Sequence, residues 1–177
     1  MRPADLTPVA RDVMKGPAGV GLIFFSLLAA FALSVLPWSG AWLLARPDFL
    51  LLVLIFWTVH EPRAIGQGVA FALGLLMDVS DSMLLGQHAL AYVVAIFGAQ
   101  VLRVRILSFH LPEQSLHVMG LTFMASAIVL LLNLLLGGDW PGLAYFVSPA
   151  LTALLWAPTT SVLHSSLVRR GRREASP

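Results

Sequence analysis

The sequence predicts an all-α integral membrane protein, a compact bundle of six transmembrane helices with the N- and C-termini in the cytoplasm. Composition is the first reason: 58% of the 177 residues are hydrophobic and only 11% are charged, against about 25% charged in soluble domains. The apolar residues also form six runs, and the basic residues lie at the chain ends and in short connections. The composition largely excludes a soluble enzyme and a nucleic-acid-binding protein.

The first span is predicted at residues 17–36, after a polar cytoplasmic tail at residues 1–16. Its twenty uncharged residues are enough to cross a hydrocarbon core of about 30 Å at about 1.5 Å per residue. Pro17 suits the first position of a helix. The run is longer than the apolar part of a signal peptide, about 7–15 residues, so we interpret it as an uncleaved helix.

Spans two and three are short, at about 49–60 and 65–79, and His60-Glu61-Pro62-Arg63 separates them. They can form two short spans or one re-entrant hairpin. The basic residues favour two spans, because cytoplasmic loops are enriched in arginine and lysine. Six crossings place ten of the eleven basic residues inside and only Arg46 outside, whereas a re-entrant hairpin would place the arginine-rich tail outside. The ten inside residues are Arg2, Arg11, Lys15, Arg63, Arg103, Arg105, Arg169, Arg170, Arg172 and Arg173.

The second half of the chain completes the membrane domain, residues 17–168. A fourth span is predicted at about 88–102, followed by a longer polar connection at 103–117 that suits the membrane surface. The fifth span covers about 117–136, and the sixth about 149–168. For the sixth span, Ser148 is the expected cap, Pro149 the first helical residue and Pro158 a kink. Residues 169–177 form a basic cytoplasmic tail.

A stripe of small residues marks the third span, with Gly66, Ala70, Gly74 and Asp78 four positions apart. Small residues at this spacing let helices approach closely, so the face either packs inside the bundle or receives a partner helix. An acidic residue is costly against lipid. We therefore expect Asp78 to fix the end of this helix by accepting hydrogen bonds from backbone amides of the following loop. The alternative is a solvated loop carboxylate.

No pattern for catalysis or for metal binding stands out. The chain has no cysteine, which excludes thiolate zinc sites and a thiol nucleophile. Asp78 and Asp81 are close in sequence, but their loop offers few further oxygen ligands for a metal. There is no Gly-x-Ser-x-Gly elbow and no phosphate-binding glycine loop. The sequence therefore predicts a protein that is not an enzyme, with no catalytic residue, metal or cofactor.

An ordered set of short motifs resembles the MreD family of rod shape-determining proteins. In sequence order, these are Arg46-Pro47-Asp48, Trp57, His60-Glu61-Pro62-Arg63, Gly66-x-Gly68, Ala70-Phe71, Gly74-Leu75-x-x-Asp78, Gly86-x-His88-Ala89-Leu90-x-Tyr92 and Gln114. One departure is Trp156-Ala157-Pro158, where the family often has tryptophan and proline adjacent. The candidate structural or partner-binding residues are Pro62, Gly66, Ala70, Gly74, Asp78, Gly86 and Gln114.

The resemblance implies a non-enzymatic component of the bacterial cell-elongation machinery, a multi-pass protein of the inner membrane. Such proteins bind the single-span protein MreC. That assembly links cytoplasmic MreB filaments to the peptidoglycan synthases RodA and a class B penicillin-binding protein. The resemblance also implies a fold like that of the substrate-binding subunits of energy-coupling-factor vitamin transporters. Membrane lipid is an expected partner and nucleic acid is not.

The alternative function is that of a substrate-binding membrane subunit of a vitamin transporter. Such a subunit needs polar groups that converge on a pocket, and it needs an ATPase as partner. The sequence places few polar residues at membrane depth, which favours the first function.

Overall fold

The computed structural model describes residues 19–40 and 45–174, with side chains described as far as Ser165. Every regular element in these ranges is helical, so the all-α prediction is confirmed. The elements are α1 (Val20–Val35), α3 (Phe49–His60), α4 (Gln67–Ser80), α5 (Gln87–Ser108), α6 (Leu111–Leu135), the 3₁₀ turn η1 (Leu143–Phe146), α7 (Val147–Leu154) and α8 (Trp156–Glu174). The expected tail at 1–16 and the helix start at Pro17 lie outside the described residues, as do the side chains of the basic tail.

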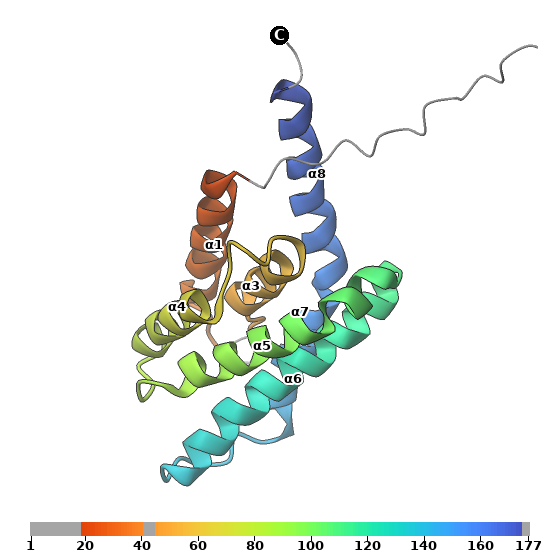
Figure 1. Ribbon diagram of the computed structural model, residues 1–177. Helices are drawn as coiled ribbons and strands as arrows, with labels where there is room; N and C mark the ends of the chain where they lie inside the picture. The colour runs from red at the N-terminus through yellow and green to blue at the C-terminus, as the bar shows by residue number, and fades with distance from the viewer. Residues whose placement is uncertain (1–18, 41–44, 175–177) are drawn as a thin grey trace, which may run out of the picture.

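Helix α3 is the centre of the fold, and Figure 1 shows it between α1 and α8. All ten residues from Leu50 to Val59 are buried, as expected for a helix that is apolar on every side. It packs mainly against α1 and α5, with further contacts to α6, α7 and α8. The indole of Trp57 donates a hydrogen bond to the Ser26 hydroxyl at 2.8 Å, which ties α3 to α1.

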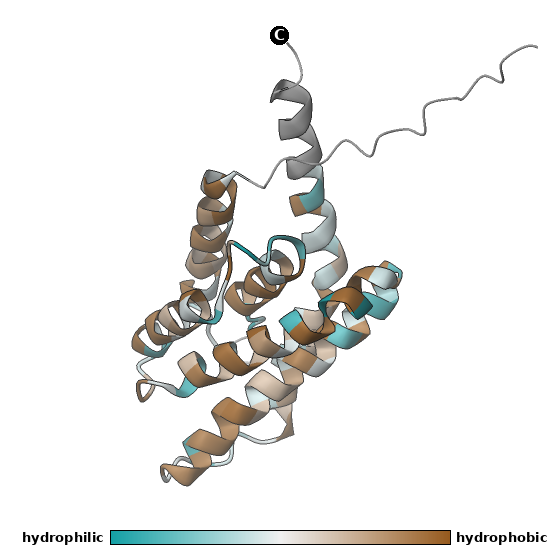
Figure 2. Cartoon of the chain, viewed as in Figure 1, coloured by the Kyte–Doolittle hydropathy of each residue, from teal (hydrophilic) through white to brown (hydrophobic). Residues whose placement is uncertain are grey.

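Many exposed side chains of the other helices are apolar, and the ribbons of α1, α4, α5 and α6 are mostly brown in Figure 2. Large exposed side chains include Phe24 and Phe25 on α1, Phe97 and Val104 on α5, and Leu135 on α6. Contiguous apolar surface of this extent is rare on a soluble monomer. Three helical segments are also long and apolar enough to cross a membrane: Gln87–Ser108, Leu111–Leu135 and Leu143–Ser165. These features identify a membrane protein.

The predicted polar connection at 103–117 is almost entirely helical. Helix α5 continues to Ser108 and α6 begins at Leu111, so both helices extend beyond the predicted spans 88–102 and 117–136. The polar side chains serve the helix ends instead. Arg103 donates to the Val59 carbonyl at 2.7 Å, and His110 and Glu113 form a capping box at the start of α6. Hydropathy therefore marked the end of the apolar stretch, not the end of the helix.

The predicted sixth span is helical but begins differently. Ser148 is not a cap, because η1 and α7 have already begun before it, and its hydroxyl donates to the Arg46 carbonyl. The helix is interrupted at Leu155, between α7 and α8, and not at Pro158 itself. Pro158 has no N–H for the carbonyl four residues earlier, which explains a break one turn before the proline. Helix α8 continues to Glu174, into the predicted tail.

Candidate functional site

Asp78, at the C-terminal end of α4, holds the loop that leads into α5. One carboxylate oxygen accepts a hydrogen bond from the Gly86 backbone N–H at 2.8 Å. The other accepts from the His88 backbone N–H at 2.8 Å and contacts the His88 ring Nδ1 at 3.0 Å. Asp78 is 0% exposed, which excludes the solvated carboxylate. The predicted hydrogen bonds to loop amides are present.

Gly86 makes this arrangement possible. Its φ of 107° lies in the left-handed region, which side chains rarely adopt. The conformation turns the chain at the start of α5 and directs the Gly86 N–H at Asp78. Helix α4 and the start of α5 are therefore joined by one carboxylate.

The small-residue face of α4 packs inside the chain. Ala70 is fully buried, and a methyl group at Gly74 would lie 2.7 Å from the Ala89 nitrogen and 2.8 Å from the His88 carbonyl oxygen. Close packing within the bundle, one of the two predicted possibilities, is therefore what the structure shows for these two positions. Gly66 differs, because it is the extended residue before α4 and a side chain there would meet nothing within 4 Å.

Two further candidate residues lie away from Asp78. Pro62 is exposed in the turn between α3 and α4. Gln114, in the first turn of α6, bonds within the chain: its side-chain N–H donates to the Phe109 carbonyl at 2.9 Å. Its carbonyl oxygen accepts from the Trp156 indole at 3.0 Å. Gln114 therefore links the start of α6 to the start of α8.

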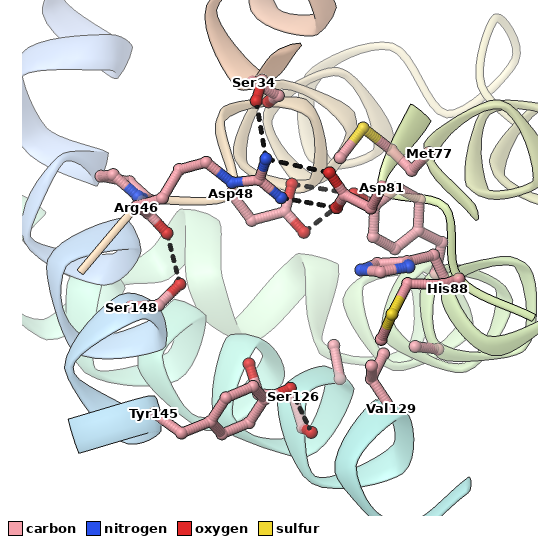
Figure 3. Close-up of a pocket in the computed structure, with 15 residues that line it drawn as sticks. Ser34, Arg46, Asp48, Met77, Asp81, His88, Ser126, Val129, Tyr145 and Ser148 are labelled. Carbon is pink, nitrogen blue, oxygen red and sulfur yellow. Dashed lines mark hydrogen bonds and ion pairs between the residues drawn. The ribbon is translucent and has the colours of Figure 1, made fainter. Parts of the chain in front are cut away.

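The hydrogen bonds of Asp78 to Gly86 and His88 are called the Asp78 anchor below. A polar cluster that was not predicted from the sequence lies beside this anchor (Figure 3). The Arg46 guanidinium forms a two-pronged ion pair with Asp81, at 2.9 and 2.5 Å, and also donates to the Ser34 carbonyl at 3.0 Å. The Arg46 and Asp81 side chains are only 21% and 19% exposed. Burial alone would lower the pKa of Arg46, but the hydrogen bonds and charge of Asp81 raise it. The guanidinium therefore stays charged.

Asp48 is the second acidic residue of the cluster. It caps α3 by accepting from the Leu51 N–H at 2.9 Å, and the Tyr92 hydroxyl donates to it, 2.8 Å from both carboxylate oxygens. Its own N–H donates to the Thr152 hydroxyl at 2.9 Å. Burial raises the pKa of Asp48, and the Leu51 hydrogen bond only partly opposes this. Asp48 therefore joins three helices: its carboxylate bonds to α3 and α5, and its backbone N–H bonds to α7.

These side chains line a cavity of about 300 Å³. Figure 3 shows Arg46, Asp48, Asp81 and His88 on one side of it and Tyr145, Ser126 and Val129 on the other. The volume is at the lower end of the range for small-molecule sites, about 300–1,000 Å³. Among the described residues no group of histidines and carboxylates could hold a metal ion.

The comparisons with known proteins agree with the sequence resemblance. A family model described as the rod shape-determining protein MreD matches residues 16–165. The chain is also similar to a rod shape-determining protein MreD of Haemophilus influenzae. The two are 30% identical over 112 residues, which cover 63% of this chain and 68% of the relative. No solved structure matches.

Proposed function

The chain belongs to the MreD family of rod shape-determining membrane proteins, and from this membership we propose that it binds MreC in the bacterial inner membrane. Through MreC it helps couple MreB filaments to the peptidoglycan synthases RodA and a class B penicillin-binding protein. The family match over residues 16–165 is the observation that carries the proposal. In this function the protein is a scaffold and performs no chemical step.

We further propose that six helices cross the membrane and that both termini are cytoplasmic. Three helices are long enough to cross alone, and Val20–Val35, Phe49–His60 and Gln67–Ser80 are shorter apolar helices. The 10:1 distribution of basic residues supports this topology. A fold like that of the energy-coupling-factor subunits remains a prediction.

The MreC helix must then dock on a surface other than the α4 stripe. Ala70 and Gly74 are already covered by the chain itself. Exposed apolar side chains that could meet a partner helix lie on α1, at Phe24, and on α5, at Phe97. A photoreactive amino acid at each position would show which face crosslinks to MreC.

The proposal is tested by purifying the tagged full chain from native membranes in mild detergent and identifying the co-purifying proteins by mass spectrometry. We expect MreC, with RodA and the penicillin-binding protein at lower yield. A preparation without MreC, obtained from membranes that contain it, would contradict the proposal. Recovery of a pair of transporter ATPases would support the second candidate function.

That second candidate is the substrate-binding subunit of a small-molecule transporter. One observation favours it: the cavity beside Arg46 gathers polar side chains from several helices. The sequence, which has few polar residues per span, did not predict this convergence.

A further inference from the structure

The cavity beside Arg46 has one polar and acidic wall and one largely apolar wall. The polar wall carries Arg46, Asp48 and Asp81. Facing it are the Tyr145 ring and the side chain of Val129. A ligand that fits both walls must combine a polar group with a short apolar body.

The positive and negative charges on the polar wall do not balance. Two carboxylates lie beside one guanidinium, and the guanidinium is already occupied by Asp81 and by the Ser34 carbonyl. The His88 ring lines the same wall, and its Nδ1 contacts Asp78. Asp48 accepts hydrogen bonds only from uncharged donors among the described residues, the Leu51 amide and the Tyr92 hydroxyl. Arg46 and His88 act on Asp48 only through their charge, and neither forms a direct ion pair with it in the described part of the chain. A buried carboxylate that lacks a direct ion pair is costly. The wall therefore favours a cation and disfavours an anion.

A second, independent observation comes from Ser34 at the end of α1. Ser34 lines the cavity and is 1% exposed, and its side-chain hydroxyl has no hydrogen-bond partner in the described part of the chain. Buried hydroxyl groups are nearly always hydrogen-bonded, because an unpaired one has lost its hydrogen bonds to water without a replacement. A polar atom of a ligand in the cavity would supply the missing partner.

We propose that the cavity binds a primary ammonium group on a short body that also carries an oxygen atom, as in ethanolamine. The ammonium donates hydrogen bonds to Asp48 and neutralises it. The oxygen of the body bonds to the Ser34 hydroxyl, and the carbon atoms lie against Val129 and the Tyr145 ring. The same chemistry is present in free ethanolamine and in the head group of an aminophospholipid. The inference does not depend on binding to MreC.

Free ethanolamine is the first probe. The full chain is reconstituted in nanodiscs of phosphatidylcholine, whose quaternary ammonium has no N–H to donate, and binding is measured by calorimetry. We expect saturable binding of ethanolamine, with choline and ethylene glycol each at least about tenfold weaker. Choline lacks the N–H donors and ethylene glycol lacks the charge, and a hydrogen bond that involves a charged group is roughly twice as strong as a neutral one.

The head group of an aminophospholipid is the second possible source of the bound ammonium group. Nanodiscs of mixed phosphatidylethanolamine and phosphatidylglycerol are examined by native mass spectrometry for lipid that stays on the protein. Retained phosphatidylethanolamine would assign the ammonium to a lipid head group. Binding of ethanolamine without retained lipid would assign it to a free amine.

Two variants separate binding from folding. Asp48→Asn should weaken ethanolamine binding about tenfold or more while keeping the helix cap, because asparagine caps helices as well as aspartate. Ser34→Ala should weaken binding about fivefold without loss of stability, because it removes a hydroxyl that the empty protein leaves unpaired. Ser161→Ala is the matched control, since that exposed hydroxyl bonds within its own helix.

Three results would overturn the inference: no ethanolamine binding and no retained aminophospholipid by the folded protein, equal binding in Asp48→Asn, or stronger binding of acetate than of ethanolamine. Unchanged affinity in Ser34→Ala, which a purely structural role of Ser34 predicts, is a fourth result that would contradict the inference.

Discussion

Asp78 and His88 are joined twice: one carboxylate oxygen of Asp78 accepts the backbone N–H of His88 at 2.8 Å and contacts its ring Nδ1 at 3.0 Å. The same carboxylate accepts the Gly86 N–H. The end of α4 and the start of α5 therefore depend on one buried side chain.

Asp78→Ala should destabilise the protein by about 2–5 kcal/mol, because it leaves at least two buried amides without an acceptor, at about 1–3 kcal/mol each. Thermal unfolding in detergent, followed by circular dichroism, measures the loss. Asp139→Ala is the control, since Asp139 is exposed. Equal unfolding temperatures for the two variants would show that the anchor does not stabilise the fold.

Gly74→Ala should also destabilise the protein, because the added methyl group would collide with the backbone of Ala89 and His88. Backbone atoms cannot move aside cheaply, so we expect a loss of about 1–3 kcal/mol. Gly68→Ala, on the same helix, meets nothing within 4 Å and should be neutral or stabilising by up to about 1 kcal/mol. If both substitutions had the same effect, close packing at Gly74 would be refuted.

The ion pair between Arg46 and Asp81 should show a coupling energy of about 1–3 kcal/mol in a double-mutant cycle with Arg46→Gln and Asp81→Asn. We expect this value to exceed that of exposed pairs, about 0–1 kcal/mol, because both side chains are mostly buried and the pair is two-pronged. The coupling energy is calculated from the free energies of chemical unfolding of the wild type, the two single variants and the double variant. A coupling near zero would mean that the two charges act independently.

Gln114→Ala should cost about 1–3 kcal/mol by leaving the indole N–H of the fully buried Trp156 without its acceptor. Gln114→Glu keeps an acceptor at this position and should cost less. Tryptophan fluorescence, followed during unfolding, measures the stability of both variants. The opposite order of stabilities would contradict a role for this hydrogen bond in joining α6 to α8.

Asp48→Asn should change how stability depends on pH when the cavity is empty. Burial raises the pKa of Asp48 in the folded state, so its contribution is fully present below the unfolded pKa and is lost as pH rises through the folded pKa. Arg46, His88 and Tyr92 face the same carboxylate and are unchanged in the variant. Asp48→Asn should therefore gain stability relative to the wild type between acidic and neutral pH, as unfolding at a series of pH values would show. A difference in stability between the variant and the wild type that stays constant with pH would contradict the raised pKa of Asp48.

The Asp78 anchor could be predicted from the sequence because its partners follow within eleven residues. A carboxylate at a helix end near lipid needs donors, and loop amides are the nearest ones. The cluster around Arg46 could not be predicted in the same way. Asp81 lies 35 residues from Arg46, and Tyr92 lies 44 residues from Asp48, so only the packing of α3 and α4 against α5 brings them together.

The C-terminal end of α5 and the start of α6 show a different limit of prediction from the sequence. Arg103 and Glu113 lie in the segment predicted as a polar connection, yet both stabilise helix ends. Hydropathy reports the surroundings of a side chain and not the conformation of its backbone.

The most direct test of the central claim is the shape of cells of the source bacterium after depletion of this protein, measured by microscopy as the ratio of length to width. We predict rounder cells, restored to normal shape by the wild-type chain and by Asp139→Ala but not by Asp78→Ala. Depleted cells that keep their normal length and width through several divisions would contradict it.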